Sequence, residues 1–570
     1  MLLRQATANL FRRRIRPPSQ IFSNASNFVI SYLYSIFCLD SIAFAGTTKT
    51  NFSYQPPSDI HQHWWSLIHR DPRLWFFLFG NAAIFVGINT SPILAKQVST
   101  EENLKDDSDF VGLRKIEDGS VISNIHTSKW RVFTDYARDM FLQGKLKEAE
   151  QFFLSALEEA KQGFGERDPH VASSCNNLAE LYRVNRAFDK AEPLYLQAID
   201  ILEQTFGPED IRVGSALHNL GQFYLVQRKL EEAHNCYERA VKIKGRVLGH
   251  NHVDYADTMY HLGMVLYLRG KNVDAEALVL DSVRILEESG QAESTVCVKR
   301  LRYLAQIYLK TNRVREAENV QRKILHILEL TKGWNSLDTV IAAEGLALTL
   351  ESAGSLKEAQ ELIERCLNAR KTLLPEDHIQ IGANWLHIAR LAMLNANWLR
   401  KMDTSKAIAA LEKAKDHLNN SVRIAENILN KLSEQNGKVQ GLGAPGETRK
   451  NGREALVILL QSYDALGLLE ITKKELQDLK DEHTPVVEAG NSFFRCISAY
   501  KKFGSEKPIH DTRDVKTEYL SCLKHLASLI IDTDTDTEGT QRSDRLKLND
   551  IKNEIKHVEA EVSPQRRERN

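Results

Sequence analysis

Small side chains recur along the middle of the chain at a constant interval of 42 residues. One register is Ala149, Ala191, Ala233, Ala275, Ala317 and Ala359. A second is Ala137, Ala179, Gly221, Gly263, Ala305, Ala347 and Ala389, and a third is Leu178, Leu220, Leu262, Leu304 and Leu346. A fixed period of this length is typical of a repeat protein.

Within one period the apolar residues have helical spacing. Leu178, Leu181 and Tyr182 mark one stripe, and the polar turn Asn185-Arg186 separates it from the next. The second stripe is Ala191, Tyr195, Ala198 and Leu202. Each period therefore predicts a helical hairpin with small residues where the two helices cross, since larger ones would overpack that contact. Stacked hairpins bury faces that one hairpin cannot, so the predicted fold class is all-α, an α-solenoid with a 42-residue period.

These hairpins resemble tetratricopeptide repeats, although the usual period is about 34 residues and the second helix should be longer here. Residues 170–210, HVASSCNNLAELYRVNRAFDKAEPLYLQAIDILEQTFGPED, resemble a kinesin light chain repeat. GERDPHVA (165–172) and LGHNHVDYA (248–256) resemble that family's inter-repeat loop. The resemblance covers roughly residues 130–390 and implies a protein that binds peptides in a concave groove. The family's N-terminal coiled coil is missing from this sequence, which disfavours a motor subunit.

The N-terminal region carries targeting features. No acidic residue precedes Asp40, and five arginines lie before Ser19: Arg4, Arg12, Arg13, Arg14 and Arg16. Such a start is typical of an organelle transit peptide. The scarcity of serine favours a mitochondrion over a chloroplast, and a basic tail or a secretory signal are the other interpretations.

A candidate transmembrane helix follows at 74–95, where 22 residues carry no charge. A cleaved sorting segment or a buried helix is the alternative. Arg70 and Arg73 precede it and acidic residues follow it, so an inner mitochondrial membrane would place the bulk of the chain in the intermembrane space. The layout of presequence, span and repeats is also similar to that of mitochondrial tetratricopeptide proteins that assist respiratory-complex assembly.

The repeat pattern fades after residue 390. A seventh hairpin is expected from Trp385 to Ile428, and further helices at about 454–480, 486–503 and 514–531. The final helix, with Leu548, Ile551, Ile555 and Val558 on one face, predicts a cap or a short coiled-coil seam. The predicted organisation is 1–73 transit peptide and linker, 74–95 membrane helix, 96–129 linker, 130–431 repeat array, 432–453 Gly-rich linker, 454–531 C-terminal helical region, and 532–570 acidic break and terminal helix.

Composition excludes several function classes. Lys+Arg and Asp+Glu both number 75, so no net positive charge favours nucleic acid. Seven cysteines without a CxxC pair indicate neither a disulfide framework nor a zinc module, and the cysteines are interpreted as small core residues. Gly441-x-Gly443-x-x-Gly446 lacks a strand and helix context, and the aspartates from Asp532 lack the remaining calcium-loop positions. His250 and His252 are interpreted as solvated loop residues. We therefore expect no enzyme activity, cofactor or metal.

The remaining candidate is a groove lined by the first helix of each hairpin. Amides there can pair with the backbone of an extended peptide, and cations can meet an acidic group. The predicted partner-binding residues are Asn176, Asn177, His218, Asn219, Gln222, Tyr260, His261, Lys299, Arg302 and Tyr303. The kinesin light chain resemblance singles out Asn177 and Asn219. Alternatively, these residues only solvate the groove or join hairpins.

The sequence thus predicts a scaffold that binds a protein or peptide partner, anchored by a single span in a mitochondrial membrane and acting as an assembly or adaptor factor. A cytosolic kinesin light chain-like cargo adaptor and a plastid-targeted scaffold are the alternatives. The oligomeric state is not predicted.

Overall fold

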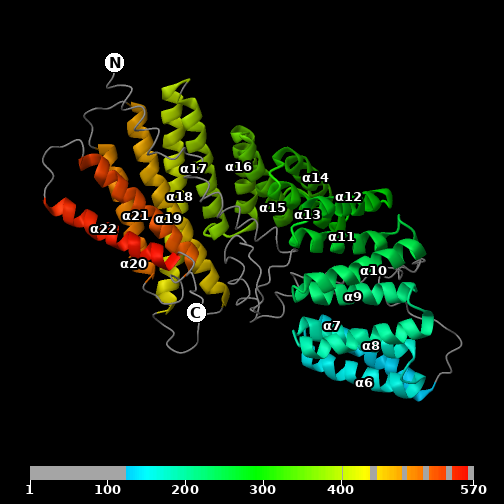
Figure 1. The fold of residues 1–570 in the computed structure, drawn as a ribbon. Coiled ribbons are helices and arrows are strands. Elements are labelled where there is room, and N and C mark those ends of the chain that lie inside the picture. Colours follow the sequence, from blue (N-terminus) through cyan, green and yellow to red (C-terminus); the bar gives the residue numbers. More distant parts are fainter. Residues whose placement is uncertain are drawn as a thin grey trace, which may run out of the picture. The chain divides into compact units, whose positions relative to one another are not determined.

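The computed structural model describes residues 124–400, 402–436, 446–477, 484–504, 512–534 and 542–562, and every regular element in these ranges is a helix (Figure 1). The helices are α5 (Ile125–Leu142), α6 (Leu146–Phe164), α7 (Pro169–Val184), α8 (Phe188–Phe206), α9 (Ile211–Val226), α10 (Leu230–Leu248), α11 (Val253–Leu268), α12 (Asn272–Glu288), α13 (Thr295–Lys310), α14 (Val314–Lys332), α15 (Leu337–Ala353), α16 (Leu356–Leu373), α17 (Ile379–Leu399), α18 (Thr404–Asn436), α19 (Gly446–Gln477), α20 (Thr484–Gly504), α21 (Arg513–Asp534) and α22 (Arg542–Val562). The predicted all-α solenoid is confirmed. The predicted transit peptide and the 74–95 span lie outside the described residues.

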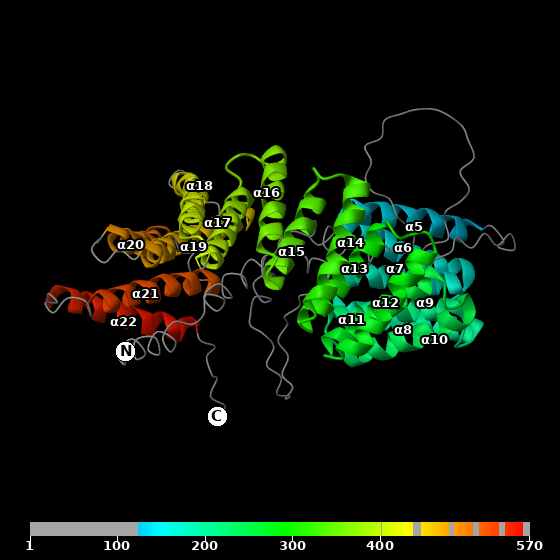
Figure 2. The same cartoon turned by 90° about the horizontal axis from the view of Figure 1, so that it is seen from above.

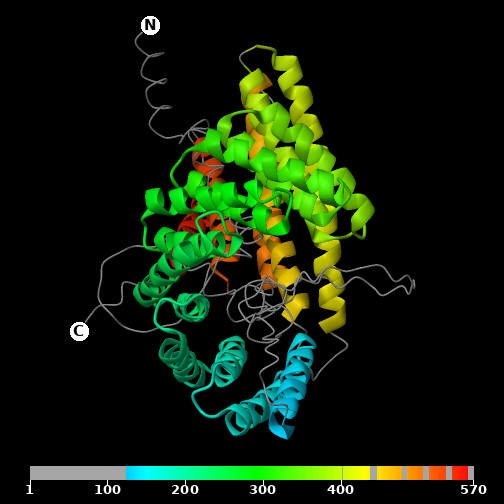
Figure 3. The ribbon, with the colours of Figure 1, turned by 90° about the vertical axis from the view of Figure 1, so that its right-hand side faces the viewer.

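The chain divides into two compact units at α14, between Val320 and Gln321. We call the described residues 124–320 the first unit and those from 321 to 562 the second unit. In the first unit, the helices from cyan to green follow one another as stacked hairpins (Figure 3).

The helix ends repeat with the same period as the core. An N-cap residue precedes the first helix of each of these hairpins. Its side chain accepts a hydrogen bond from a backbone N–H in the first turn, where the helix itself provides no acceptor. These N-caps, spaced 42 residues apart, are Asp168, Asp210, His252, Ser294, Ser336 and His378. His250 and His252 are exposed and lie between helices, as expected; in addition, His252 caps α11 and His250 packs edge-on against Tyr255.

The turn inside each hairpin also recurs. One residue per turn has a positive φ, at Gly144, Arg186, Arg228, Gly270, Asn312 and Gly354. The predicted Asn185-Arg186 turn is one of them, with φ 59° at Arg186.

The small residues lie where the periodicity predicts close helix contacts. The six alanines from Ala149 to Ala359 are 0% exposed. A Cβ atom added to Gly221 would meet the Tyr237 ring at 2.9 Å, so α9 and α10 approach closely at this position. In the preceding hairpin Ala179 and Tyr195, both buried, occupy the same two phases.

The second unit begins with the regular hairpin of α15 and α16 and then changes character. The hairpin expected from Trp385 to Ile428 is a longer pair of helices, with 21 residues in α17 and 33 in α18. α18 extends to Asn436 and α19 begins at Gly446. The two helices therefore extend into both ends of the linker that was expected at 432–453.

The C-terminal helices pack as one cluster, in which α21 and α22 lie side by side (Figure 2). Val558 of α22 is buried in this core, with Ile551 and Ile555 packed against it. The terminal helix therefore acts as a cap over the core of this unit. Within the described residues one stretch, Asn451–Leu476 of α19, is long and apolar enough to cross a membrane, and 83% of its most apolar window is buried inside this cluster.

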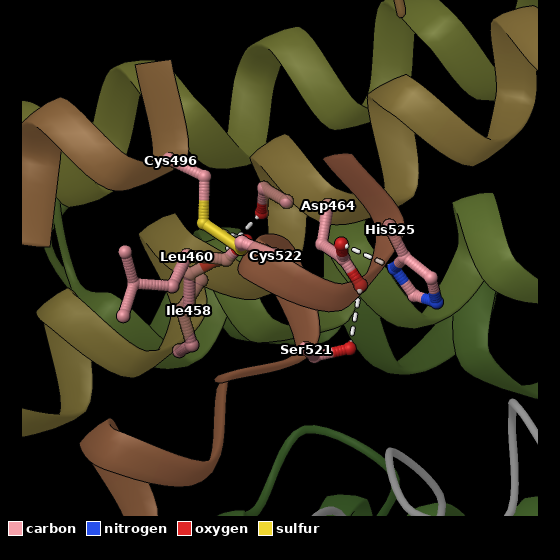
Figure 4. Close-up of a disulfide and its surroundings, with 8 residues drawn as sticks. Ile458, Leu460, Asp464, Cys496, Ser521, Cys522 and His525 are labelled. Atoms are coloured by element: carbon pink, nitrogen blue, oxygen red, sulfur yellow. Dashed lines mark hydrogen bonds and ion pairs between the residues drawn. A yellow bond between two sulfur atoms is a disulfide. The ribbon is translucent and has the colours of Figure 1, made fainter. Parts of the chain in front are cut away.

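A disulfide joins α20 to α21 through Cys496 and Cys522 (Figure 4). Both cysteines are buried, as the interpretation of the cysteines as small core residues expected, but the bond between them was not predicted. The interpretation also holds for Cys175, Cys297 and Cys366, which are buried and belong to no disulfide among the described residues, whereas Cys236 is only partly buried.

Candidate peptide-binding groove

The predicted partner-binding residues lie on the first helices of four successive hairpins. Asn176 and Asn177 are on α7, His218, Asn219 and Gln222 on α9, Tyr260 and His261 on α11, and Lys299, Arg302 and Tyr303 on α13. Most of them occupy two consecutive positions of the 42-residue repeat. Because equivalent positions of stacked hairpins line up, these residues form one row across the four helices. We call this row the polar stripe.

Exposure divides the polar stripe into two groups. Asn176, His218, Gln222, Tyr260, His261 and Tyr303 are buried. Asn177, Asn219, Lys299 and Arg302 are partly exposed. Only the second group can offer much side-chain surface to a partner.

The three asparagines of the polar stripe, two on α7 and one on α9, differ in their contacts. Asn219 Nδ2 donates to Asn176 Oδ1 across the hairpin boundary at 3.0 Å, so Asn176 serves mainly to join repeats. That bond uses one of the two Nδ2 protons of Asn219 and leaves its Oδ1 as an acceptor. The side chain of Asn177 makes no hydrogen bond to any other described residue. Asn177 and Asn219 therefore carry amide groups suited to pairing with a peptide backbone.

The buried residues of the stripe mainly connect neighbouring hairpins. His218 Nδ1 lies 3.1 Å from Thr258 Oγ1 on α11, and Gln222 Nε2 lies 3.0 Å from His218 Nε2. The Tyr303 hydroxyl donates to the carbonyl of Met264 at 3.3 Å, and its ring packs edge-on against Tyr260. The alternative that part of the stripe joins hairpins thus holds for these residues.

Sequence reasoning missed the charged group beside these histidines. Asp257 of α11 forms an ion pair with Arg300 of α13, with 3.2 Å between Oδ1 and Nη2. The partial burial of Asp257 would raise its pKa, but His261 and Arg300, both positive at the acidic pH where this carboxyl titrates, hold the pKa well below its usual value. Burial lowers the pKa of His218 and of His261, which keeps both rings neutral at pH 7. The positions equivalent to Asp257 in other hairpins include Ser173, Ser215 and Lys299. No acidic residue recurs there, so the 42-residue period did not point to Asp257.

Comparison with known proteins agrees with this geometry. A tetratricopeptide repeat family model matches residues 131–204, 175–246 and 212–288, and a second one matches 339–380. The chain carries tetratricopeptide repeats. Such repeats indicate a protein–protein interaction scaffold, and their fold is typical of non-enzymatic proteins. A search of curated proteins found no match to the chain.

Several solved structures are similar to the chain. A putative kinesin light chain from Podosopora anserina with TPR-like repeats is 23% identical, with 36% of this chain and 98% of that one aligned and a TM-score of 0.34. BtubC (BKLC) from P. vanneervenii is 16% identical over 44% of this chain and 93% of its own, with a TM-score of 0.35. The apo form of RapI is 11% identical over 53% and 98%, also with a TM-score of 0.35.

Proposed function

We propose that the protein is a mitochondrial, membrane-anchored assembly or adaptor factor whose tetratricopeptide groove binds an extended segment of a partner protein. The proposed peptide binding rests on two partly exposed amides, Asn177 and Asn219, which occupy equivalent positions in two successive hairpins. An amide side chain offers both a donor and an acceptor, so a ladder of amides can hold a peptide backbone without demanding one sequence.

The anchor and the compartment rest on the sequence features before residue 124: the arginine-rich start and the uncharged stretch 74–95. The disulfide between Cys496 and Cys522 gives independent support for a compartment other than the reducing cytosol, since disulfides are rare there. It also disfavours the cytosolic cargo adaptor and agrees with repeats that face the intermembrane space. The plastid-targeted scaffold remains the second candidate.

The groove is tested by cross-linking in isolated mitochondria. A photo-reactive residue at position 177 should capture a protein, whereas the same residue at Asn235, exposed on the second helix α10 of its hairpin, should not. Asn177→Ala combined with Asn219→Ala should lower recovery of the captured protein at least tenfold, and Asn235→Ala should leave recovery unchanged. Equal labelling from both positions, or unchanged recovery in the double variant, would reject the groove.

The anchor is tested by import followed by carbonate extraction and protease treatment of mitoplasts. We expect the chain to stay in the membrane pellet and the repeats to be digested once the outer membrane is opened. Release by carbonate would reject the anchor, and import into plastids alone would select the second candidate.

A further inference from the structure

Three side chains with metal-binding atoms meet at the floor of the polar stripe. His218 comes from α9, and Asp257 and His261 come from one face of α11, four residues apart. One ligand atom of each lies within 4.8 Å of the other two. Asp257 Oδ2 lies 3.7 Å from His218 Nε2 and 3.8 Å from His261 Nδ1, so a single carboxylate oxygen faces both rings.

The surroundings orient the ring of His218. Thr258 Oγ1 donates its proton to the carbonyl of Asp254, so it accepts from His218 Nδ1. The one proton of the neutral ring is therefore on Nδ1, and the lone pair of Nε2 accepts a hydrogen bond from Gln222 Nε2 at 3.0 Å, which His218 must give up to bind an ion beside Asp257. A second bond that fixes the tautomer of a histidine is the usual support of a metal ligand.

The carboxylate is oriented in a similar way. Arg300 binds Oδ1 of Asp257 and is itself held by the carbonyl of Ser282 at 3.0 Å. This leaves Oδ2 toward the histidines. The Asp257 side chain is 41% exposed, which gives an ion a path from solvent to the two rings, which are 9% and 11% exposed.

The geometry points to a binding site for a divalent transition-metal ion of the zinc class at His218, Asp257 and His261. Two imidazoles are borderline donors that suit zinc and its neighbours better than calcium or magnesium, and zinc also accepts the harder carboxylate oxygen as a third ligand. Three protein ligands leave at least one coordination position open toward the groove. For His261 to bind through Nδ1, it must give up its 2.9 Å contact with the carbonyl of Asp257 and carry its proton on Nε2.

Two cations oppose the ion. Arg300 pairs with Asp257, and Lys244 of α10 is buried close enough for Asp257 to act on it electrostatically. Like charges repel strongly where solvent is excluded, so removing the charge of Lys244 should strengthen metal binding. A purely structural polar cluster would not show this opposite sign.

The experiment is a zinc titration of the purified full-length chain by calorimetry after treatment with a chelator. The wild type should bind one equivalent at this site. Asp257→Asn and His261→Gln should each weaken binding at least tenfold, and Lys244→Met should tighten it several-fold. His326→Ala, at an exposed histidine of α14, is the matched control and should bind as the wild type does.

Circular dichroism in the chelator checks that each variant is folded. If a variant does not fold, X-ray absorption spectroscopy of the zinc-loaded wild type tests the site instead. Two imidazole nitrogens and at least one oxygen are expected around the ion. No saturable zinc binding by the wild type, unchanged affinity in both ligand variants, or a metal shell without imidazole would overturn the proposal. Any of these results would leave the peptide groove unaffected, since Asn177 and Asn219 are not ligands.

Discussion

The hairpins α7–α12 and the C-terminal cluster α19–α22 are both helical cores, but they use different means of holding helices together. In the hairpins, the same contact recurs in two successive periods: Tyr182 and Tyr224 donate to Glu150 and Glu192, at 2.9 and 3.0 Å. In the cluster, the contacts occur once, such as the disulfide and the binding of Ser521 and His525 to Asp464 (Figure 4). Repetition spreads stability over many equivalent contacts, whereas the cluster depends on a few.

Reduction of the disulfide is the test of this difference with the largest expected effect. Cys496 and Cys522 are 26 residues apart, and closing a loop of that length contributes about 3 kcal/mol in the chain-entropy model. Reductant should therefore increase hydrogen exchange in α20 and α21 and leave α9 and α11 unchanged, as measured by mass spectrometry. The paired change Cys496→Ala and Cys522→Ala should reproduce the effect without reductant. An equal increase in both regions would mean that the hairpins are not independent of this bond.

Close helix contacts give the next comparison. A Cβ atom at Gly467 would meet the Phe493 ring at 2.4 Å, and we expect Gly467→Ala to lower the free energy of unfolding by about 2 kcal/mol. Gly221→Ala should cost less than about 1 kcal/mol, because the equivalent position in the preceding hairpin is alanine and alanine favours a helix over glycine.

Gly490→Ala is the control for this pair within the cluster, since the nearest atom to its Cβ would be 3.8 Å away. It should be neutral or slightly stabilising. Urea denaturation followed by far-ultraviolet circular dichroism ranks the three variants. A Gly221 variant less stable than the Gly467 variant would contradict the expected tolerance of the repeats.

Two carboxylates, Glu180 and Glu518, supply the last test. Glu180 in the hairpins binds Arg183 at 2.8 and 3.0 Å, whereas Glu518 in the cluster accepts a bond from the neutral Gln461 at 2.9 Å. Burial raises the pKa of Glu518 from 4.5 to about 7. The folded protein then holds a proton that the unfolded chain releases, so stability should fall as the pH rises from about 4.5 toward 7, by on the order of 2 kcal/mol.

Glu518→Gln should remove that part of the pH dependence because glutamine does not titrate. Thermal unfolding of the two proteins across this pH range measures the difference. A constant gap between their midpoints at every pH would show that Glu518 does not titrate there.

The 42-residue interval predicted the hairpins, the buried alanines and the helices that carry the polar stripe, because each rests on local spacing repeated many times. The interval could not predict that Asn176 is buried and Asn177 partly exposed. This difference in burial depends on how neighbouring hairpins are rotated against each other. The interval also missed Asp257, whose phase holds other residue types elsewhere, and the bond between Cys496 and Cys522, whose helices are brought together only by tertiary packing.

The matching of Tyr182 to Glu150 and of Tyr224 to Glu192 has a consequence for how such a protein can grow. The α7–α8 hairpin presents the tyrosine on its first helix and the glutamate on its second, so a tandem duplication of residues 169–210 would insert with a tyrosine–glutamate bond at each of its two junctions. Gene duplication could thus lengthen the array one module at a time without any new interface having to evolve.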